Sequence, residues 1–257
     1  MASGRAFGTA RRKPRRKTGV STSPRLDSWT NSFAKEESAM LRRKGSLGFF
    51  QNEKRVNFDE GYIKFSLSMT QGDIPKHPDW EKLNNARGSL HQLGLIGTYP
   101  NGIGFGNVSM RNSGLEFIIT GTATGGIPIL REHDYCLIES FELEKNQVRA
   151  MGRTKASSES MTHGAIYSAE ESIRSVMHFH NRKIFDSMLL DGSVPKTPKD
   201  IEYGTPQMAI AMDRIVRKSG KNSGFFVTEG HDEGVFAYGP SIDQALEQTH
   251  LLLRRFA

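Results

Sequence analysis

The sequence predicts one α/β domain of about 200 residues, preceded by a separate basic extension. Three observations lead to this expectation. Patterns typical of strands and of helices mix throughout residues 55–257, no repeat of solenoid period is present, and the excess positive charge is confined to residues 1–50. With 257 residues in total, the chain is long enough for such a domain to bury a sizeable core.

Residues 55–151 are expected to form mainly strands around one helix. The helix covers residues 80–93, because Leu83, Ala86 and Leu90 recur at helical spacing, and it ends at Gly94. The glycine-rich segment 102–106 leads into a strand that includes residues 107–110. The other strands expected here are 55–58, 62–67, 117–120 and the two arms of a hairpin, 135–142 and 147–151.

Helices dominate the second half of the sequence. A helix begins near Ser158 and has Glu159 in its first turn. The apolar pattern of residues 206–218 predicts a strong helix that Gly220 stops. A last helix starts at Ser241, with Gln244 completing a capping box. Residues 173–180 and 225–228 are expected to be strands.

Two histidines stand one residue apart on the strand predicted for residues 173–180. Successive side chains of a strand point to opposite faces, so His178 and His180 share one face and can converge on one metal ion. The alternative is a pair of surface histidines on an edge strand. Glu159 and His231 lie in two other motifs of the chain. A carboxylate and a third imidazole in addition to His178 and His180 favour a metal site with an acid/base partner.

The N-terminal extension carries most of the charge. Residues 1–50 contain 12 Lys and Arg against 3 Asp and Glu, whereas the net charge of the whole chain is +7. This segment lacks apolar periodicity and is expected to be disordered. Three interpretations remain open: an organelle transit peptide, a nuclear-import or nucleic-acid-binding patch, or a solvated extension without a specific partner.

The rest of the composition is that of a soluble protein. No stretch approaches the roughly 20 apolar residues that span a bilayer. The single cysteine, Cys136, excludes an internal disulfide, fits a reducing compartment and is expected to be buried and inert.

Taken in order, these motifs resemble the class II aldolase/adducin-head superfamily. The resemblance covers residues 75–257 and rests on the segments 106–109, 119–125, 157–159, 163–167, 178–180 and 230–234. Glu159 lies nineteen residues before His178, a spacing similar to that of the fuculose-1-phosphate aldolases. The resemblance implies a three-layer α/β/α domain, residues 55–257, around a mostly antiparallel central sheet.

The resemblance also implies a role for each matching residue. Glu159 would be the acid/base residue beside zinc or another divalent transition metal. The metal would be bound by His178, His180 and His231. The phosphate of the substrate would be bound by Gly106, Asn107, Thr124, Gly125, Ser157 and Ser158. Small hydroxyl groups and glycine amides near a helix start do form an anion site.

The sequence departs from the family pattern at two places. Family members keep a His directly before a Gly in the third segment, whereas here Glu233 precedes Gly234 and His231 stands two residues earlier. The third ligand is therefore His231 or Glu233, since zinc also accepts carboxylate oxygen, and His231 is favoured. Gly104 replaces a Thr before the Gly-Asn motif, which predicts a looser phosphate pocket.

Several of these residues have a purely structural alternative. Ser157 and Ser158 could cap the helix, and Glu159 could only complement its dipole. The glycines of residues 102–106 could serve only a turn. No role is assigned to His77, His91, His133 or His163.

Three functions are compatible with such a chain. The first is a zinc-dependent lyase that breaks or forms a carbon–carbon bond of a sugar phosphate through a metal-stabilised enediolate. The second is epimerisation of a pentulose phosphate or dehydration of a ketose phosphate. Epimerases typically have Asp where this chain has Glu159, so the lyase is favoured. The third is a non-catalytic module like the adducin head, which would not need to retain His178 and His180.

The resemblance implies a homotetramer in which a neighbouring subunit completes each site. Asp200, Glu202 and Tyr203 are candidates for that contributed residue. We expect a cytoplasmic protein without membrane partners, with organelle targeting and nucleic acid as alternatives for the basic extension only.

Overall fold

A computed structural model describes residues 61–257 of the protein. An eight-stranded sheet with the order β1-β7-β6-β5-β4-β8-β10-β9 forms its centre, and β2 and β3 form a small separate pair. The strands are β1 (Ser66–Gln71), β2 (Gly97–Thr98), β3 (Gly104–Phe105), β4 (Asn107–Arg111), β5 (Phe117–Thr120), β6 (Tyr135–Glu142), β7 (Gln147–Gly152), β8 (Ser175–His180), β9 (Gly224–Val227) and β10 (Gly234–Gly239). Neighbours in the large sheet run antiparallel, except for the parallel pair β1 and β7.

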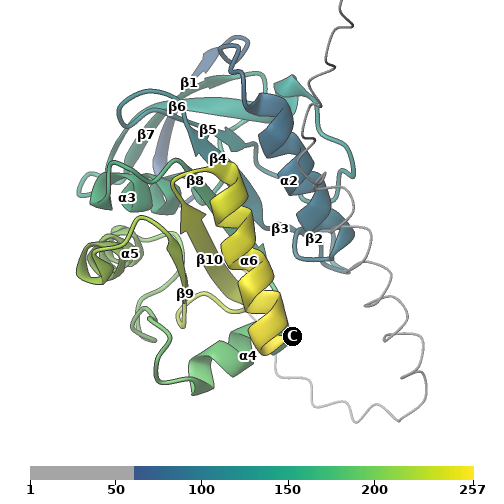
Figure 1. The fold of residues 1–257 in the computed structure, drawn as a ribbon. Coiled ribbons are helices and arrows are strands. Elements are labelled where there is room, and N and C mark those ends of the chain that lie inside the picture. The colour runs from purple at the N-terminus through teal and green to yellow at the C-terminus, as the bar shows by residue number, and fades with distance from the viewer. Residues whose placement is uncertain (1–60) are drawn as a thin grey trace, which may run out of the picture. The chain divides into compact units, whose positions relative to one another are not determined.

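Helices cover both faces of the sheet and make it a three-layer domain (Figure 1). The helices are α2 (Trp80–Gln92), the 3-10 turn η1 (Glu132–Asp134), α3 (Ser160–Ala169), α4 (Arg182–Leu190), α5 (Pro206–Ser219) and α6 (Ile242–Phe256). One apolar core joins α2, α4 and α6 to one face of the sheet, and a second joins α3 and α5 to the other face. The expected mostly antiparallel α/β/α domain is therefore confirmed.

Local sequence signals explain where the two long C-terminal helices begin and end. Thr205 caps α5 by accepting from the amide of Met208, and Pro206 occupies the first turn, where its missing N–H costs nothing. Gly220 ends α5 with φ of 61°, a left-handed conformation that glycine adopts without strain. In α6 the hydroxyl of Ser241 accepts from the amide of Gln244, which is one of the two hydrogen bonds of the expected capping box.

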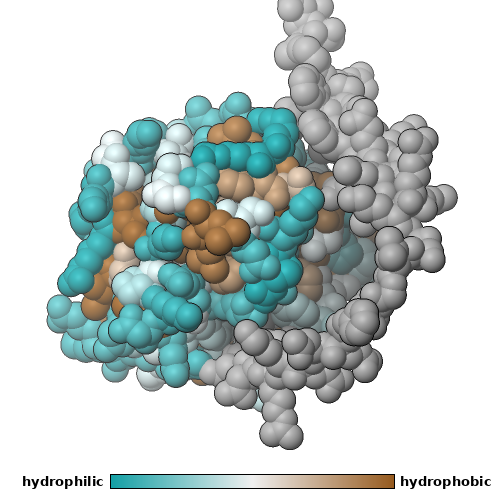
Figure 2. Space-filling model, turned by 90° about the horizontal axis from the view of Figure 1, so that it is seen from below, coloured by the Kyte–Doolittle hydropathy of each residue, from teal (hydrophilic) through white to brown (hydrophobic). Residues whose placement is uncertain are grey.

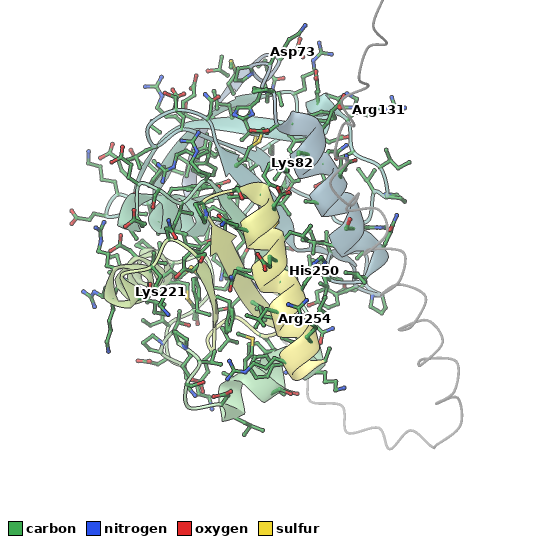
Figure 3. The ribbon with its side chains drawn as sticks, in the orientation of Figure 1. Asp73, Lys82, Arg131, Lys221, His250 and Arg254 are labelled. Carbon is green, nitrogen blue, oxygen red and sulfur yellow. The ribbon has the colours of Figure 1, made fainter. Side chains whose placement is uncertain are left out.

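Helices α2 and α6 lie side by side on their face of the sheet. Lys82 Nζ on α2 donates to Asp243 Oδ2 in the first turn of α6 at 2.6 Å. Figure 3 shows Lys82 beside the start of α6, with His250 and Arg254 further along the same helix.

Some expected elements differ from the structure. The predicted strand at 55–58 and the basic extension at 1–50 lie outside the described residues. The strand expected at 62–67 begins only at Ser66 and runs to Gln71. Helix α4 and strand β10 were not predicted, because a nine-residue helix and a short apolar run between glycines carry little periodicity of their own.

The surface of the described part is mixed. In the view of Figure 2, apolar residues gather near the middle of the face and hydrophilic residues surround them. None of the helices within residues 61–257 combines the length and apolarity that crossing a bilayer requires.

Candidate metal centre

Strand β8 lies in the middle of the sheet, between β4 and β10. His178 is opposite Asn107 on β4 and Phe236 on β10, so the histidine pair is not on an edge strand. His178 is fully buried and His180 is 3% exposed, which excludes the interpretation as two surface histidines. Their Nε2 atoms are 3.1 Å apart. Two imidazole nitrogens at this separation share one small volume that a cation could occupy.

His231 reaches the same place from the loop between β9 and β10. Its amide donates to Thr228 O at 2.9 Å, and its carbonyl accepts from the amide of Gly234 at 3.0 Å, so the loop folds back tightly. A Cβ at Gly230 would lie 1.8 Å from Ile201 O, and only glycine fits this turn. The potential ligand atoms of His178, His180 and His231 all lie within 4.8 Å of one another.

Hydrogen bonds to the far nitrogens orient two of these imidazoles. His178 Nδ1 donates to Val235 O at 3.1 Å, which leaves the lone pair on Nε2. Tyr99 Oη donates its only proton to Glu233 Oε2 at 3.0 Å, so it accepts from His180 Nδ1 at 2.7 Å. His180 therefore also presents Nε2.

Electrostatics keep His178 in the form that binds metal. Burial, followed by the neighbouring His180 and His231, holds the pKa of His178 well below its ordinary value. The imidazole is therefore neutral, and a neutral imidazole with a free Nε2 is the species that coordinates a metal ion. The donor set fits zinc or a similar divalent transition metal.

Glu159 stands beside the three histidines at the start of α3. It is the N-cap residue of the helix, one position before the first turn where it was expected, and its side chain makes no capping hydrogen bond. Glu159 is 1% exposed, and its Oε1 lies 3.4 Å from His231 Nδ1 and 4.0 Å from His178 Nε2. Oε2 accepts from Thr162 Oγ1. A carboxylate is thus held at the edge of the histidine cluster.

Glu233 has a different environment from His231. Its Oε1 accepts from Arg182 Nε at 3.1 Å and its Oε2 accepts from Tyr99 Oη. Among the described residues, Glu233 is absent from the group of side chains whose ligand atoms converge. Of the two alternatives for the third ligand, this geometry supports His231 and gives Glu233 a supporting contact through Tyr99.

The residues expected to bind phosphate come from three loops next to this cluster. Asn107 is 7% exposed and lies opposite His178 on the neighbouring strand. Gly121 bridges Ala156, so the loop that contains Thr124 and Gly125 runs beside Ser157 and Ser158.

Two close backbone approaches hold these loops against the histidines. Gly106 has φ of 75°, and a Cβ there would lie 2.7 Å from Ile96 Cγ1. A Cβ at Gly125 would lie 3.0 Å from Phe105 N, and the Phe105 ring centroid is 5.6 Å from that of His180. Gly106 thus packs against the backbone of His178, and Gly125 packs against Phe105, whose ring neighbours that of His180.

The serines have local contacts as well. Ser157 Oγ accepts from the amide of Glu159 at 3.2 Å, and Ser158 is 7% exposed with no capping bond to α3. Thr124 Oγ1 donates to Gly121 O at 2.8 Å. Glu159 occupies the N-cap position of α3, so neither Ser157 nor Ser158 is the N-cap residue of this helix.

Two residues near the site were not anticipated from the sequence, and a third lies in a place other than the one considered for it. Tyr99 contacts His180 from an irregular segment that gave no motif, and Arg87 holds the loop at Thr124. Tyr203, one of three candidates for a residue contributed to a neighbouring subunit, packs its ring 4.4 Å from that of His231 in its own chain. Asp200 and Glu202 are exposed.

His163, which was assigned no role, is a buried structural histidine. Its Nδ1 lies 2.7 Å from Ser109 Oγ, which in turn is 2.7 Å from Tyr167 Oη. Burial lowers the pKa of His163 to about 3. It is therefore neutral, and none of its surface is exposed to solvent.

Comparison with known proteins gives matches of two kinds. Residues 101–256 match the protein family described as class II aldolase and adducin N-terminal domain. The solved structure of L-fuculose-1-phosphate aldolase from Thermus thermophilus is similar, with a TM-score of 0.51 and 21% identity over 68% of this chain and 89% of that chain. An aldolase II superfamily protein from Pseudomonas syringae has a TM-score of 0.50 and 15% identity over 71% and 77% of the two chains. No curated protein sequence matches the chain.

Proposed function

Since the chain belongs to the class II aldolase and adducin N-terminal domain family, we propose that it is a zinc-dependent, aldolase-type lyase that acts on a sugar phosphate. The observation that carries this proposal is the buried cluster of His178, His180 and His231 with Glu159 at its edge. Burying three imidazoles and a carboxylate together costs free energy that the binding of a metal ion would offset, and a module without chemistry would lack this compensation.

The three histidines would hold the metal through their neutral nitrogens. When bound, the metal supplies Lewis-acid polarisation of a substrate carbonyl or hydroxyl oxygen. Val235 O and Tyr99 Oη keep His178 and His180 in the required tautomer. The chain therefore fixes the ligand geometry before any ion arrives.

Glu159 is the group proposed to move a proton. In the direction of bond formation its carboxylate removes a proton from the carbon next to the substrate carbonyl, and in the direction of cleavage it returns that proton. The hydrogen bond from Thr162 Oγ1 occupies Oε2 and leaves Oε1 turned toward the histidines. Burial of Glu159 excludes water from this transfer.

The phosphate of the substrate is proposed to bind where the three glycine and hydroxyl loops meet. Gly106 and Gly125 bring backbone amides close to the cluster, Asn107, Ser157 and Ser158 add side-chain donors, and Thr124 holds its loop through the hydrogen bond of its hydroxyl to Gly121 O. A phosphate held there would anchor the substrate so that its carbonyl end lies beside Glu159.

The test begins with the metal content of the purified full-length protein. We expect about one divalent transition metal per chain after chelation and reloading with zinc. Changing both His178 and His180 to Ala should abolish this uptake while the far-UV circular dichroism stays the same. His133→Ala is the control, because its imidazole is exposed and lies outside the cluster.

A screen of ketose phosphates for cleavage into an aldehyde and a ketone phosphate follows on the loaded protein. Wild-type protein that purifies without metal and takes up no zinc at micromolar levels would remove the basis of the enzyme proposal. Zinc uptake with epimerised or dehydrated products would keep the site and change the reaction.

A further inference from the structure

One buried arginine holds the loop that carries two of the proposed phosphate-binding residues. Arg87 lies on the sheet-facing side of α2 and is 1% exposed. Its Nη2 donates to Thr124 O and to Gly125 O, both at 2.8 Å. Its Nη1 donates to Pro128 O at 3.2 Å and to Ile127 O. A single guanidinium therefore binds four carbonyls within five successive residues.

The charge of this guanidinium is not neutralised by a carboxylate. Within residues 61–257 Arg87 forms no ion pair, and its partners are carbonyl oxygens alone. Burial lowers the pKa of Arg87, yet a guanidinium remains protonated in proteins. The loop at Thr124 is thus backed by a buried positive charge.

The arginine also determines which way the loop amides point. In a planar trans peptide the C=O and the following N–H point in opposite directions. Because Thr124 O and Gly125 O face Arg87, the amides of Gly125 and Gly126 face away from it. Within the described part of the chain neither of these amides donates to a backbone acceptor. Two successive amides of this kind are typical of an anion-binding nest.

We propose that Arg87 is a positioning residue of the phosphate subsite: it turns the amides of Gly125 and Gly126 toward the substrate phosphate, and its buried charge favours an anion there. This inference rests on the proposed sugar-phosphate function. It adds to that function a residue on α2 that touches neither the metal ligands nor Glu159.

The chain offers a matched control for this role. Arg111, at the end of β4, is 3% exposed and also binds four carbonyls, those of Gly114, Tyr167, Ile173 and Glu170. Those carbonyls belong to the β4–β5 turn, the end of α3 and the segment between α3 and β8. Arg111 is four residues from Asn107 along the strand, roughly 13 Å at 3.3 Å per residue. A merely structural arginine of the same kind is therefore present away from the subsite.

The experiment uses full-length, zinc-loaded protein and inorganic phosphate as the probe, with chloride as the reference anion. Arg87→Lys keeps the charge but cannot bind four carbonyls at once. We expect it to weaken phosphate binding, measured by calorimetry, at least about tenfold. Arg111→Lys should lower the melting temperature by about as much as Arg87→Lys does, but it should leave phosphate affinity within about twofold of wild type. Zinc content should stay unchanged in both variants.

A second measurement does not depend on how well the variants fold. In wild-type protein labelled with 15N-glycine, phosphate should shift the amide resonances of Gly125 and Gly126 but not that of Gly114, which lies in the loop held by Arg111. Equal phosphate affinity in Arg87→Lys and wild type, or no shift of the two glycines on phosphate binding, overturns the role of Arg87 alone. Wild-type protein that binds phosphate no better than chloride overturns the sugar-phosphate function itself, and with it this inference.

Discussion

Replacing Glu159 by Gln tests the proposed chemistry most directly, because the two side chains have the same shape. Gln keeps an oxygen that can accept from Thr162 Oγ1, but it can neither take up nor return a proton. General acid–base catalysis contributes typically about 10²- to 10⁴-fold to a rate. Turnover should therefore fall at least about a hundredfold, which corresponds to about 2.7 kcal/mol of transition-state stabilisation.

The same substitution should change stability much less. Glu159 makes no capping hydrogen bond through its side chain, so its structural contribution to α3 is the attraction between a carboxylate and the helix dipole. That attraction is typically worth about 0.3–1 kcal/mol. Zinc affinity should stay close to that of wild type, because the proposed ligands are the three histidines.

Turnover, zinc content and melting temperature are to be measured on the same preparation once a substrate has been found. Glu170→Gln is the matched control, since Glu170 stands at the opposite end of α3, is partly exposed and lies outside the histidine cluster. A variant Glu159→Gln with undiminished turnover and a slightly lowered melting temperature would show that Glu159 only complements the helix dipole.

Three other outcomes are expected. His231→Ala should weaken zinc binding by a large factor, whereas Glu233→Gln should weaken it less, because Glu233 contacts His180 only through Tyr99. Competition with a chromophoric chelator measures both affinities, and the reverse order of effects would make Glu233 the ligand. Deleting residues 1–50, with 12 basic against 3 acidic residues, should leave zinc content, oligomeric state and turnover unchanged. Size-exclusion chromatography measures the oligomeric state, and a truncated protein that fails to assemble would show that the domain begins before residue 51. Cys136 should resist thiol reagents at about pH 8 until the protein is denatured, because burial raises the pKa of its thiol to about 12; rapid labelling of the native protein would contradict this burial.

The sequence predicted best those features that depend on a few neighbouring residues. The caps of α5 and α6, the β6–β7 hairpin and the shared face of His178 and His180 all follow from local patterns. Strand β10 has no alternation because it is buried on both faces, and its apolar run does not distinguish a strand from a helix. Its existence depends on β8 and β9, which lie elsewhere in the sequence.

Arg87 and the third ligand show what could not be predicted from local sequence patterns. Arg87 occupies a position of the apolar stripe of α2, four residues after Leu83 and three before Leu90, so a charge on a buried face was visible as a signal. Which carbonyls it binds was not visible, since Thr124 lies far along the chain. The alternative between His231 and Glu233 likewise depended on the turn at Gly230, whose close approach to Ile201 no local pattern reveals.

The central position of β8 would make binding of the proposed metal a property of the entire domain. The strand is paired on both sides, with β4 and with β10, so its amide hydrogens should exchange with solvent only when the whole sheet opens. An ion that binds only the folded state raises the unfolding free energy by about 2.7 kcal/mol at a hundred times its Kd. Zinc should therefore slow deuterium uptake in β5 and β6 by the same factor as in β8, although neither β5 nor β6 carries a ligand. Loss of the metal would lower the free energy of unfolding of the whole domain. Chelation in a cell would therefore lower the activity of the protein and also shorten its lifetime against proteolysis.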